Sequence, residues 1–255
     1  MIRLGDRTTR DLDTRPIVLV PLGSLEQHGP HLPLDTDTTI AVAVAERVAR
    51  ARNGDVVVAP PVAYGSSGEH AGFAGTLSIG QEALELVVVE LGRSADPAWH
   101  RHLVLVCGHG GNAAPLQRAV RTLVGEGRPV SAWFLPAPPG GDAHAGHTET
   151  SAMLALDPER VLAERAEPGA RRPIGELMDD LRRGGVAAVA ANGILGDPTG
   201  ASAAEGEAIV AEWVAALERH LEQVGASAST PYATTPHASA PDAATPGDRA
   251  PEGPR

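Results

Sequence analysis

The chain has 255 residues, a formal net charge of −11 and 42% apolar residues, enough for one sizeable core. All 21 basic residues are arginine, which excludes lysine Schiff-base chemistry and lysine-dependent phosphate loops, and the acidic balance argues against nucleic-acid binding. Cys107 is the only cysteine, so an internal disulfide is excluded. No apolar run reaches the ~20 residues of a membrane span, and the N-terminus lacks a signal-peptide region, so we predict a cytoplasmic protein without membrane partners.

Short apolar runs alternate with amphipathic segments along the chain. The runs are rich in β-branched residues and nearly continuous in apolar character, as in parallel strands covered on both faces. Strands are predicted over 17–22, 56–59, 103–107 and 130–135, and helices over 38–52, 81–93, 112–125, 149–156 and 204–224. This alternation predicts a three-layer αβα fold with a central, mainly parallel sheet, in one domain over residues 1–224. Residues 225–255 turn to Ala, Ser, Thr, Pro and Gly, which predicts a disordered tail.

Candidate metal ligands follow the first predicted strand. Glu26 and His28 are two residues apart and would share a face if strand geometry continued. Asp37 returns after a short Pro-containing loop; Asp35 is an alternative ligand that spacing alone does not exclude. The competing interpretation is that Glu26 and His28 cap the next helix and pair with arginine. In α/β proteins the carboxyl ends of strands are the usual place for ligands, which favours a metal site.

A second cluster follows the third predicted strand. His109 lies between Gly108 and Gly110, and glycines there let the backbone turn sharply and approach a ligand closely. The motif fits either a metal ligand or a phosphate-binding turn at a helix N-terminus. Without lysine or a GxxxxGK[ST] pattern, metal ligation is favoured. Cys107, just before this motif, is interpreted as the last core residue of its strand and not as a nucleophile.

The third cluster contains His144, His147 and Glu149. Glu149 opens a predicted helix, where the helix dipole would also favour an acid without any metal. His144 is a candidate general acid that protonates a leaving nitrogen. His147 either contacts a metal ligand without binding the metal itself, or has a purely structural role.

A Gly-rich stretch over residues 64–78 follows the second predicted strand and is long enough to be a substrate loop. Within it, Glu69 and His70 either face the site or belong to an ordinary loop.

Together these clusters offer a mixed oxygen and nitrogen donor set suited to one or two divalent ions, Zn, Mn or Fe(II). The predicted ligands are Glu26, His28, Asp37, His109 and Glu149. An aspartate among five ligands could bridge two ions. Because a bound metal lowers the pKa of water and polarises a scissile carbonyl, the sequence predicts a metal-dependent hydrolase.

Three motifs resemble the creatininase family of metal-dependent amidohydrolases, across about residues 16–224. They are GSLEQHGPHLPLDTD (Gly23–Asp37), GHGGN (Gly108–Asn112) and HAGHTETS (His144–Ser151). The resemblance implies a dinuclear site, a homo-oligomer of the hexamer or octamer type, and His144 as proton donor. It also implies Glu26, His28, His109 and a bridging Asp37 as ligands. Creatininase itself has a glutamate ligand two residues after the HGG histidine, where this chain has Gly111, so Glu149 is the implied replacement.

Four further stretches are similar to a peptidase branch of that family: Ala59–Gly65, Ser67–His70, Arg182–Val189 and Gly193–Thr199. The resemblance implies a radical-modified ribosomal precursor peptide as substrate, from which a Val-Tyr-derived C-terminal fragment is released. Arg182 and Arg183 are candidates for peptide recognition because of their charge. The alternatives are an amidohydrolase acting on a small cyclic amide or formamide in cofactor biosynthesis, and a non-catalytic metal- or phosphate-binding module.

Overall fold

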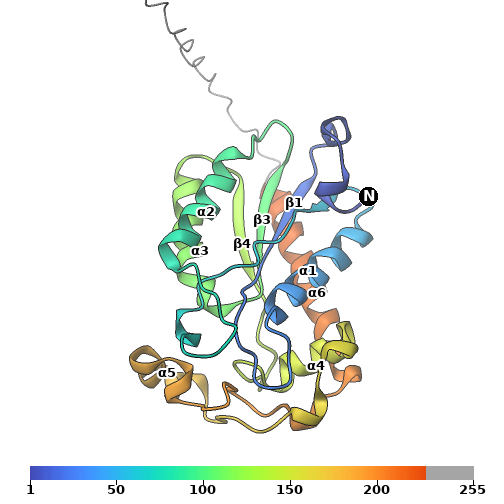
Figure 1. Ribbon diagram of the computed structural model, residues 1–255. Helices are drawn as coiled ribbons and strands as arrows, with labels where there is room; N and C mark the ends of the chain where they lie inside the picture. Colours follow the sequence, from blue (N-terminus) through green and yellow to red (C-terminus); the bar gives the residue numbers. More distant parts are fainter. Residues whose placement is uncertain (228–255) are drawn as a thin grey trace, which may run out of the picture.

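The computed structural model describes residues 1–227, and a parallel sheet runs through the middle of them (Figure 1). Its strand order is β2-β1-β3-β4. The strands are β1 (Ile17–Leu22), β2 (Val56–Val58), β3 (His102–Cys107) and β4 (Val130–Phe134). All three pairings are parallel, and Ile17 lies opposite both Val56 and His102. The four predicted strands are confirmed, each end lying within one residue of its expected place.

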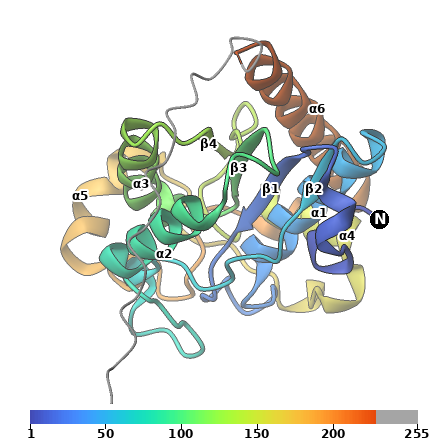
Figure 2. The ribbon, with the colours of Figure 1, turned by 90° about the horizontal axis from the view of Figure 1, so that it is seen from above.

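Helices cover both faces of the sheet, as the view from above shows (Figure 2). Ile17 and Leu19 of β1 pack on one side against α1 (Thr36–Ala51), α4 (His147–Leu156) and α6 (Ala203–Ser227). Val18 and Val20 pack on the other side against α2 (Gln81–Ser94) and α3 (Ala113–Gly125). Because successive residues of a strand point to opposite faces, one uninterrupted apolar strand serves two cores. The predicted three-layer αβα fold is therefore confirmed.

Two helices begin earlier than the sequence predicts, and both shifts concern the site. Helix α1 starts at Thr36, so Asp37 lies inside its first turn. Helix α4 starts at His147, because the Asp142 carboxylate accepts the backbone N–H groups of His147 and Thr148 and so caps the helix. Glu149 therefore lies within the first turn of α4 and does not open it.

Helix α5 (Ile174–Gly184) was not predicted from the sequence. It buries Leu177 in a small cluster with Val186, Ala190 and Leu195, against which Phe73 packs. This cluster lies apart from the two main cores, beyond the carboxyl ends of the strands (Figure 1). Ile174, Leu177, Met178 and Leu181 have the i, i+3, i+4, i+7 spacing of an amphipathic helix, so the sequence carried this signal and the omission was an error of interpretation.

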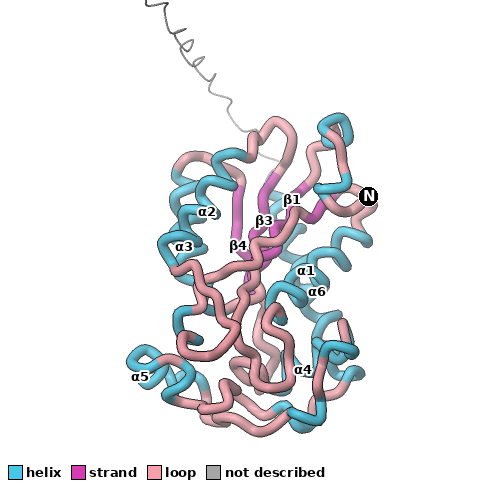
Figure 3. The backbone as a smooth tube through the Cα atoms, in the orientation of Figure 1, coloured by secondary structure: helices cyan, strands magenta, loops and turns pink. Residues whose placement is uncertain are grey.

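Long loops gather at the carboxyl ends of the strands (Figure 3). From β1 the chain continues to β2 on one side, whereas from β3 it continues to β4 on the other. The loops after β1 and β3 therefore diverge, which opens the crevice where α/β sheets bind ligands. No helix within residues 1–227 is long and apolar enough to cross a membrane. The predicted disordered tail began at residue 225, which is wrong for its first three residues, because α6 continues to Ser227; residues 228–255 lie outside the described part of the chain.

Candidate metal centre

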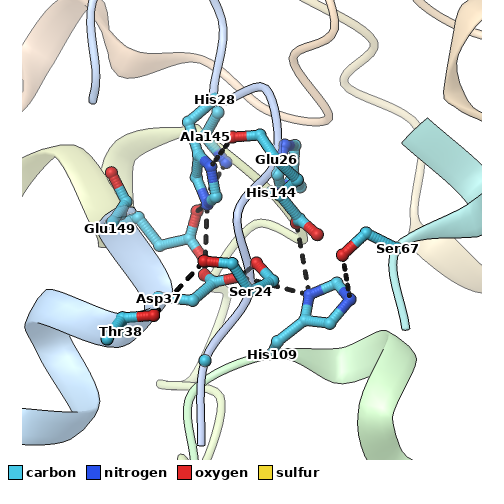
Figure 4. A network of polar contacts seen from close by, with 12 residues as sticks. Ser24, Glu26, His28, Asp37, Thr38, Ser67, His109, His144, Ala145 and Glu149 are labelled. Atoms are coloured by element: carbon cyan, nitrogen blue, oxygen red, sulfur yellow. Dashed lines mark hydrogen bonds and ion pairs between the residues drawn. The ribbon is translucent and has the colours of Figure 1, made fainter. Parts of the chain in front are cut away.

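The predicted ligands come together from the loops after β1 and β3 and from the first turns of α1 and α4 (Figure 4). Strand β1 ends at Leu22, so strand alternation does not orient Glu26 and His28; the Glu26 N–H instead donates to the Leu34 carbonyl at 3.0 Å and closes a loop. His109 follows β3 across Gly108, where a Cβ atom would lie 2.4 Å from the Asp37 carbonyl oxygen. Glycine at this position therefore allows the backbone after β3 to lie directly against the first turn of α1, while the predicted close approach to a ligand stays a prediction.

Asp37 occupies the centre of the cluster and uses both carboxylate oxygens. Its Oδ1 lies 3.1 Å from His28 Nε2, and its Oδ2 lies 3.2 Å from His109 Nδ1. Glu26 Oε1 is also 3.2 Å from His109 Nδ1, while Glu149 Oε2 is 3.8 Å from His28 Nε2. Asp37 thus contacts a histidine with each of its oxygens. Among the described residues, three groups have donor atoms within 4.8 Å of one another: Glu26, His28 and Asp37; His28, His144 and Glu149; and Glu26, His70 and His144.

Glu26 provides the test of whether these residues fit a metal. Its side chain is 0% exposed. Its Oε1 lies 3.2 Å from both His70 Nε2 and His109 Nδ1, whereas its Oε2 has no hydrogen-bond partner within residues 1–227. A buried carboxylate without such a partner is costly unless a cation compensates its charge. The donors around it are imidazole nitrogens and carboxylate oxygens, the chemistry that Zn and Mn accept. The residues present therefore fit a divalent metal.

The charges of the cluster support the same fit. Burial lowers the pKa of His28, but Asp37, Glu149 and Glu26 outweigh it and raise that pKa to about 10. Burial likewise opposes a charge on His109, yet Glu26 and Asp37 raise its pKa well above the usual value. Burial raises the pKa of Glu149 to about 7. The carboxylates thus draw positive charge into the cluster, which a divalent ion would supply directly.

Further side chains that the sequence left open lie at the same place. His70 Nε2 is 3.2 Å from Glu26 Oε1, and His144 Nδ1 is 3.7 Å from that same oxygen. Glu69 Oε1 is 3.4 Å from His109 Nε2. The long Gly-rich loop and the similarity of Ser67–His70 to a peptidase branch were the sequence signals for Glu69 and His70. Gln27, which contacts both His70 and His144, was missed because a neutral amide carries no spacing signal of its own.

Gly111, where creatininase has a glutamate, has its side-chain space already filled. A Cβ atom there would lie 2.2 Å from Glu69 Oε1 and 2.4 Å from His109 Nε2. Glu69 and Glu149 thus supply the carboxylates of this region from two other segments of the chain.

Several candidates lie away from the donors. Asp35 is partly exposed and pairs with Arg160, so Asp37 is the aspartate of the cluster. His147 pairs with Glu205 at 3.3 Å. Cys107 is the buried last residue of β3, and burial raises the pKa of its thiol to about 11, which keeps it protonated.

The two candidate peptide-binding arginines lie exposed on α5. Arg182 pairs with Asp179, and Arg183 pairs with Asp180. The described contacts of Glu26 and His28 are to histidines, carboxylates and backbone rather than to arginine, which disfavours the helix-cap interpretation.

A buried set of carboxylates and imidazoles at the switch point of a parallel sheet is typical of a metal-dependent hydrolase. Comparison with known proteins makes this class specific. Residues 6–221 match the family described as "Creatininase: Creatinine amidohydrolase". The chain belongs to the creatininase family, and the predicted amide-bond hydrolase is confirmed at that level.

Two curated relatives share more than half of their aligned residues with this chain. The mycofactocin precursor peptide peptidase of Mycolicibacterium smegmatis is 56% identical over 216 residues, covering 83% of this chain and 87% of the relative. The protein of that name from Mycobacterium ulcerans is 54% identical over 219 residues, with the same coverage. The creatinine amidohydrolase of Pseudomonas putida is 30% identical over 195 residues, covering 64% of this chain and 74% of the relative.

Solved creatininases have the same fold. A crystal structure of creatinine amidohydrolase superposes with a TM-score of 0.72 at 27% identity, covering 87% of this chain and 97% of the other. Two further creatininase structures are described as a Mn form and, for a variant, as a Zn-Zn type.

Proposed function

We propose that this chain is a metal-dependent peptidase that cleaves an amide bond near the C-terminus of a radical-modified mycofactocin precursor peptide and releases the Val-Tyr-derived fragment. The fully buried Glu26 carboxylate, whose Oε2 has no hydrogen-bond partner within the described residues and whose Oε1 contacts only imidazoles, supports the metal-dependent class. Identities of 54% and 56% to relatives named for this peptide support the substrate, against 30% to the creatinine amidohydrolase.

The proposed ligands are Glu26, Asp37 and His109 for one ion and His28, Asp37 and Glu149 for a second. A divalent ion in such a site lowers the pKa of water and polarises the carbonyl to be cleaved. Zn and Mn are favoured by the descriptions of solved creatininases, while Fe(II) stays a prediction from the donor set. The homo-oligomer and the cytoplasmic location also stay predictions.

His144 is the proposed proton carrier, and its surroundings decide the order of its two transfers. Burial lowers its pKa, and the nearby His28 and His70 lower it further, well below the usual value. The resting ring is therefore neutral and has no proton to spare. His144 must first accept a proton from the attacking water before it can donate one to the departing amine. This refines the sequence-based role, which considered only the donation.

The test is hydrolysis of the radical-modified precursor peptide by metal-analysed protein, followed by mass spectrometry of the products. We expect bound divalent metal and release of the C-terminal fragment, and loss of both after His28→Ala. The unmodified peptide and creatinine serve as comparison substrates. Metal-replete protein that leaves the modified peptide intact would contradict the peptidase assignment. Turnover of creatinine or another small cyclic amide in that preparation would select the alternative function, which the P. putida relative favours.

A further inference from the structure

Gln27 lies between two proposed ligands in the sequence and between two histidines in space. Its side chain is buried, and its nitrogen Nε2 has three close neighbours. They are His70 Nδ1 at 2.9 Å, His144 Nε2 at 3.0 Å and the Gly193 carbonyl oxygen at 2.9 Å. An amide nitrogen carries only two hydrogens, so one of these three contacts is not a hydrogen bond.

The backbone fixes which way the amide points. Its oxygen Oε1 accepts the Gly29 N–H at 2.9 Å, and its nitrogen donates to the Gly193 carbonyl. A backbone N–H can only donate and a carbonyl oxygen can only accept, so a flipped amide would lose both bonds. One hydrogen of Nε2 is therefore assigned to Gly193.

The second hydrogen is assigned through His144. Its Nε2 also lies 2.9 Å from the backbone carbonyl oxygen of Gln27, which can only accept. His144 Nε2 must therefore carry a hydrogen and donate it there, and it cannot accept another from the side-chain amide. The remaining amide hydrogen goes to His70 Nδ1, which accepts it.

In the neutral state, His70 and His144 therefore each have a single tautomer. His70 carries its hydrogen on Nε2, which points to Glu26 Oε1 at 3.2 Å. His144 leaves Nδ1 bare, facing that oxygen at 3.7 Å. The two rings lie side by side with centroids 4.4 Å apart, so a rotation of one would disturb the other.

We propose that Gln27 is a positioning residue for both imidazoles beside Glu26: its backbone carbonyl orients His144, and its side-chain amide orients His70. His144 thereby presents a bare nitrogen to the reacting groups, and His70 presents an N–H to the Glu26 carboxylate. Outer partners of this kind typically change activity by about 10–100-fold when they are removed. The catalytic consequence rests on the proposed function, whereas the tautomers do not.

The test separates the amide from the carbonyl. Gln27→Met keeps the length of the side chain and the backbone carbonyl but removes the donor to His70. In imidazole ¹⁵N–¹H correlation spectra of metal-free and Zn²⁺-reloaded protein, recorded without substrate, we expect both wild-type rings to carry the hydrogen on Nε2. In Q27M the His70 signals should change while His144 keeps its Nε2–H. With the modified peptide, kcat should fall about 10–100-fold with little change in KM.

Asn192→Ala is the matched control. Asn192 holds the Gly193 loop, with Nδ2 3.1 Å from the Pro168 carbonyl oxygen and Oδ1 3.2 Å from the Ile194 nitrogen. If Gln27 acted only by anchoring that loop, N192A would reproduce the changes at His70. An unchanged His70 ring in Q27M, or a wild-type His70 with its hydrogen on Nδ1, would overturn the proposal. Because these spectra need no substrate, they give their answer even if the peptidase assignment fails.

Discussion

Glu26 and Asp37 show how much the site depends on a compensating charge. Both carboxylates are almost completely buried, and the nearest positive charges available from the chain are those of His28 and His109. Ionised groups are held at such depth only when they are paired or bind a cation. The proposed ions therefore have a structural role as well as a catalytic one, and residue changes in this cluster should show in metal content before they show in folding.

Within the proposed centre, Glu149 is the carboxylate nearest to His28 after Asp37. In this chain the Ala145 N–H donates to Glu149 Oε2 at 2.6 Å. Glu149→Gln keeps an oxygen for that bond but removes the negative charge beside His28. We expect one metal ion fewer per chain and a kcat lower by about 100-fold or more. Elemental analysis and peptide turnover measure both. The control is Glu205→Gln, on a partly exposed acid that pairs with His147; equal metal content in the two variants would count against Glu149 as a ligand.

Gly111 and Gly110 offer a paired test of how tightly the centre is packed. A Cβ atom on Gly111 would collide with Glu69, His109 and the Ser66 carbonyl oxygen, whereas one on Gly110 would meet nothing within 4 Å. Gly111→Ala should displace His109 and lower turnover by about tenfold to 100-fold, with weaker metal retention. Gly110→Ala should stay close to wild type. Similar losses in both variants would mean that backbone flexibility, not crowding at His109, sets the effect.

The sequence predicts much of the donor set because ligand chemistry is specific in residue type and place. Glu26, His28 and His109 could be selected because acids and histidines directly after buried strands are rare without a function. Gln27 could not be selected, since its role depends on hydrogen-bond partners that only folding brings near, such as Gly193. Asp35 and Asp37 could not be separated by spacing, because the difference is the direction of each side chain at the start of α1.

At the scale of the element, α4 is held in place by α6, and that contact positions Glu149. Gly206 of α6 lies so close to α4 that a Cβ atom would be 1.8 Å from the Ser151 carbonyl oxygen. Gly206→Ala should lower the free energy of unfolding by about 1–3 kcal/mol through overpacking. It should also weaken metal retention, because α4 carries Glu149.

Gly225, near the other end of α6, is the matched control. A Cβ atom there would meet nothing within 4 Å, so Gly225→Ala should raise the free energy of unfolding by up to about 1 kcal/mol through helix propensity. Urea unfolding at fixed metal concentration compares the two variants. If Gly206→Ala were also stabilising, the close packing of α4 on α6 would be refuted.

The strands that form the centre of the fold were predicted, whereas one helix and the early start of another were missed. The strands were found because parallel strands buried on both faces are almost purely apolar, as in Ile17–Leu22. Helix α5 was missed although Ile174, Leu177, Met178 and Leu181 have helical spacing; it packs in a small cluster outside the two main cores. The early start of α4 was missed since its cap, Asp142, lies before a glycine and two histidines and forms no simple capping motif.

At the scale of the whole molecule, the two ends of the parallel strands carry different polar groups. The acidic donor cluster lies at the carboxyl ends of the strands. A chain of polar contacts lies at the opposite end, near the start of β3. There His102 Nε2 lies 3.1 Å from Ser131 Oγ, which lies 3.0 Å from His220 Nε2 of α6. Burial lowers the pKa of His102 to about 4, and the neighbouring His220 and His100 contribute. These contacts connect β3, β4 and α6, and none of the proposed metal ligands takes part in them.

The buried His102 should make folding sensitive to acid. His102 has an ordinary pKa of 6.5 when unfolded and about 4 when folded, so between these values the unfolded chain binds the proton and the folded chain does not. Its contribution to stability is present above pH 6.5 and is lost as the pH falls towards 4. His102→Gln cannot take up this proton. Near pH 5, unfolding of the wild type should therefore take up as much as about one proton more than unfolding of the variant.

The measurement is the free energy of unfolding against pH, in chelator, so that loss of metal in acid does not contribute to the slope. Above pH 7 the wild type and His102→Gln should run parallel, which serves as the internal control. Between pH 6.5 and 4 the wild-type curve should fall more steeply. Parallel curves through that window would mean that His102 binds its proton equally well in both states. The acid sensitivity of the fold would then come from other histidines whose pKa burial lowers, such as His31, His100 and His220.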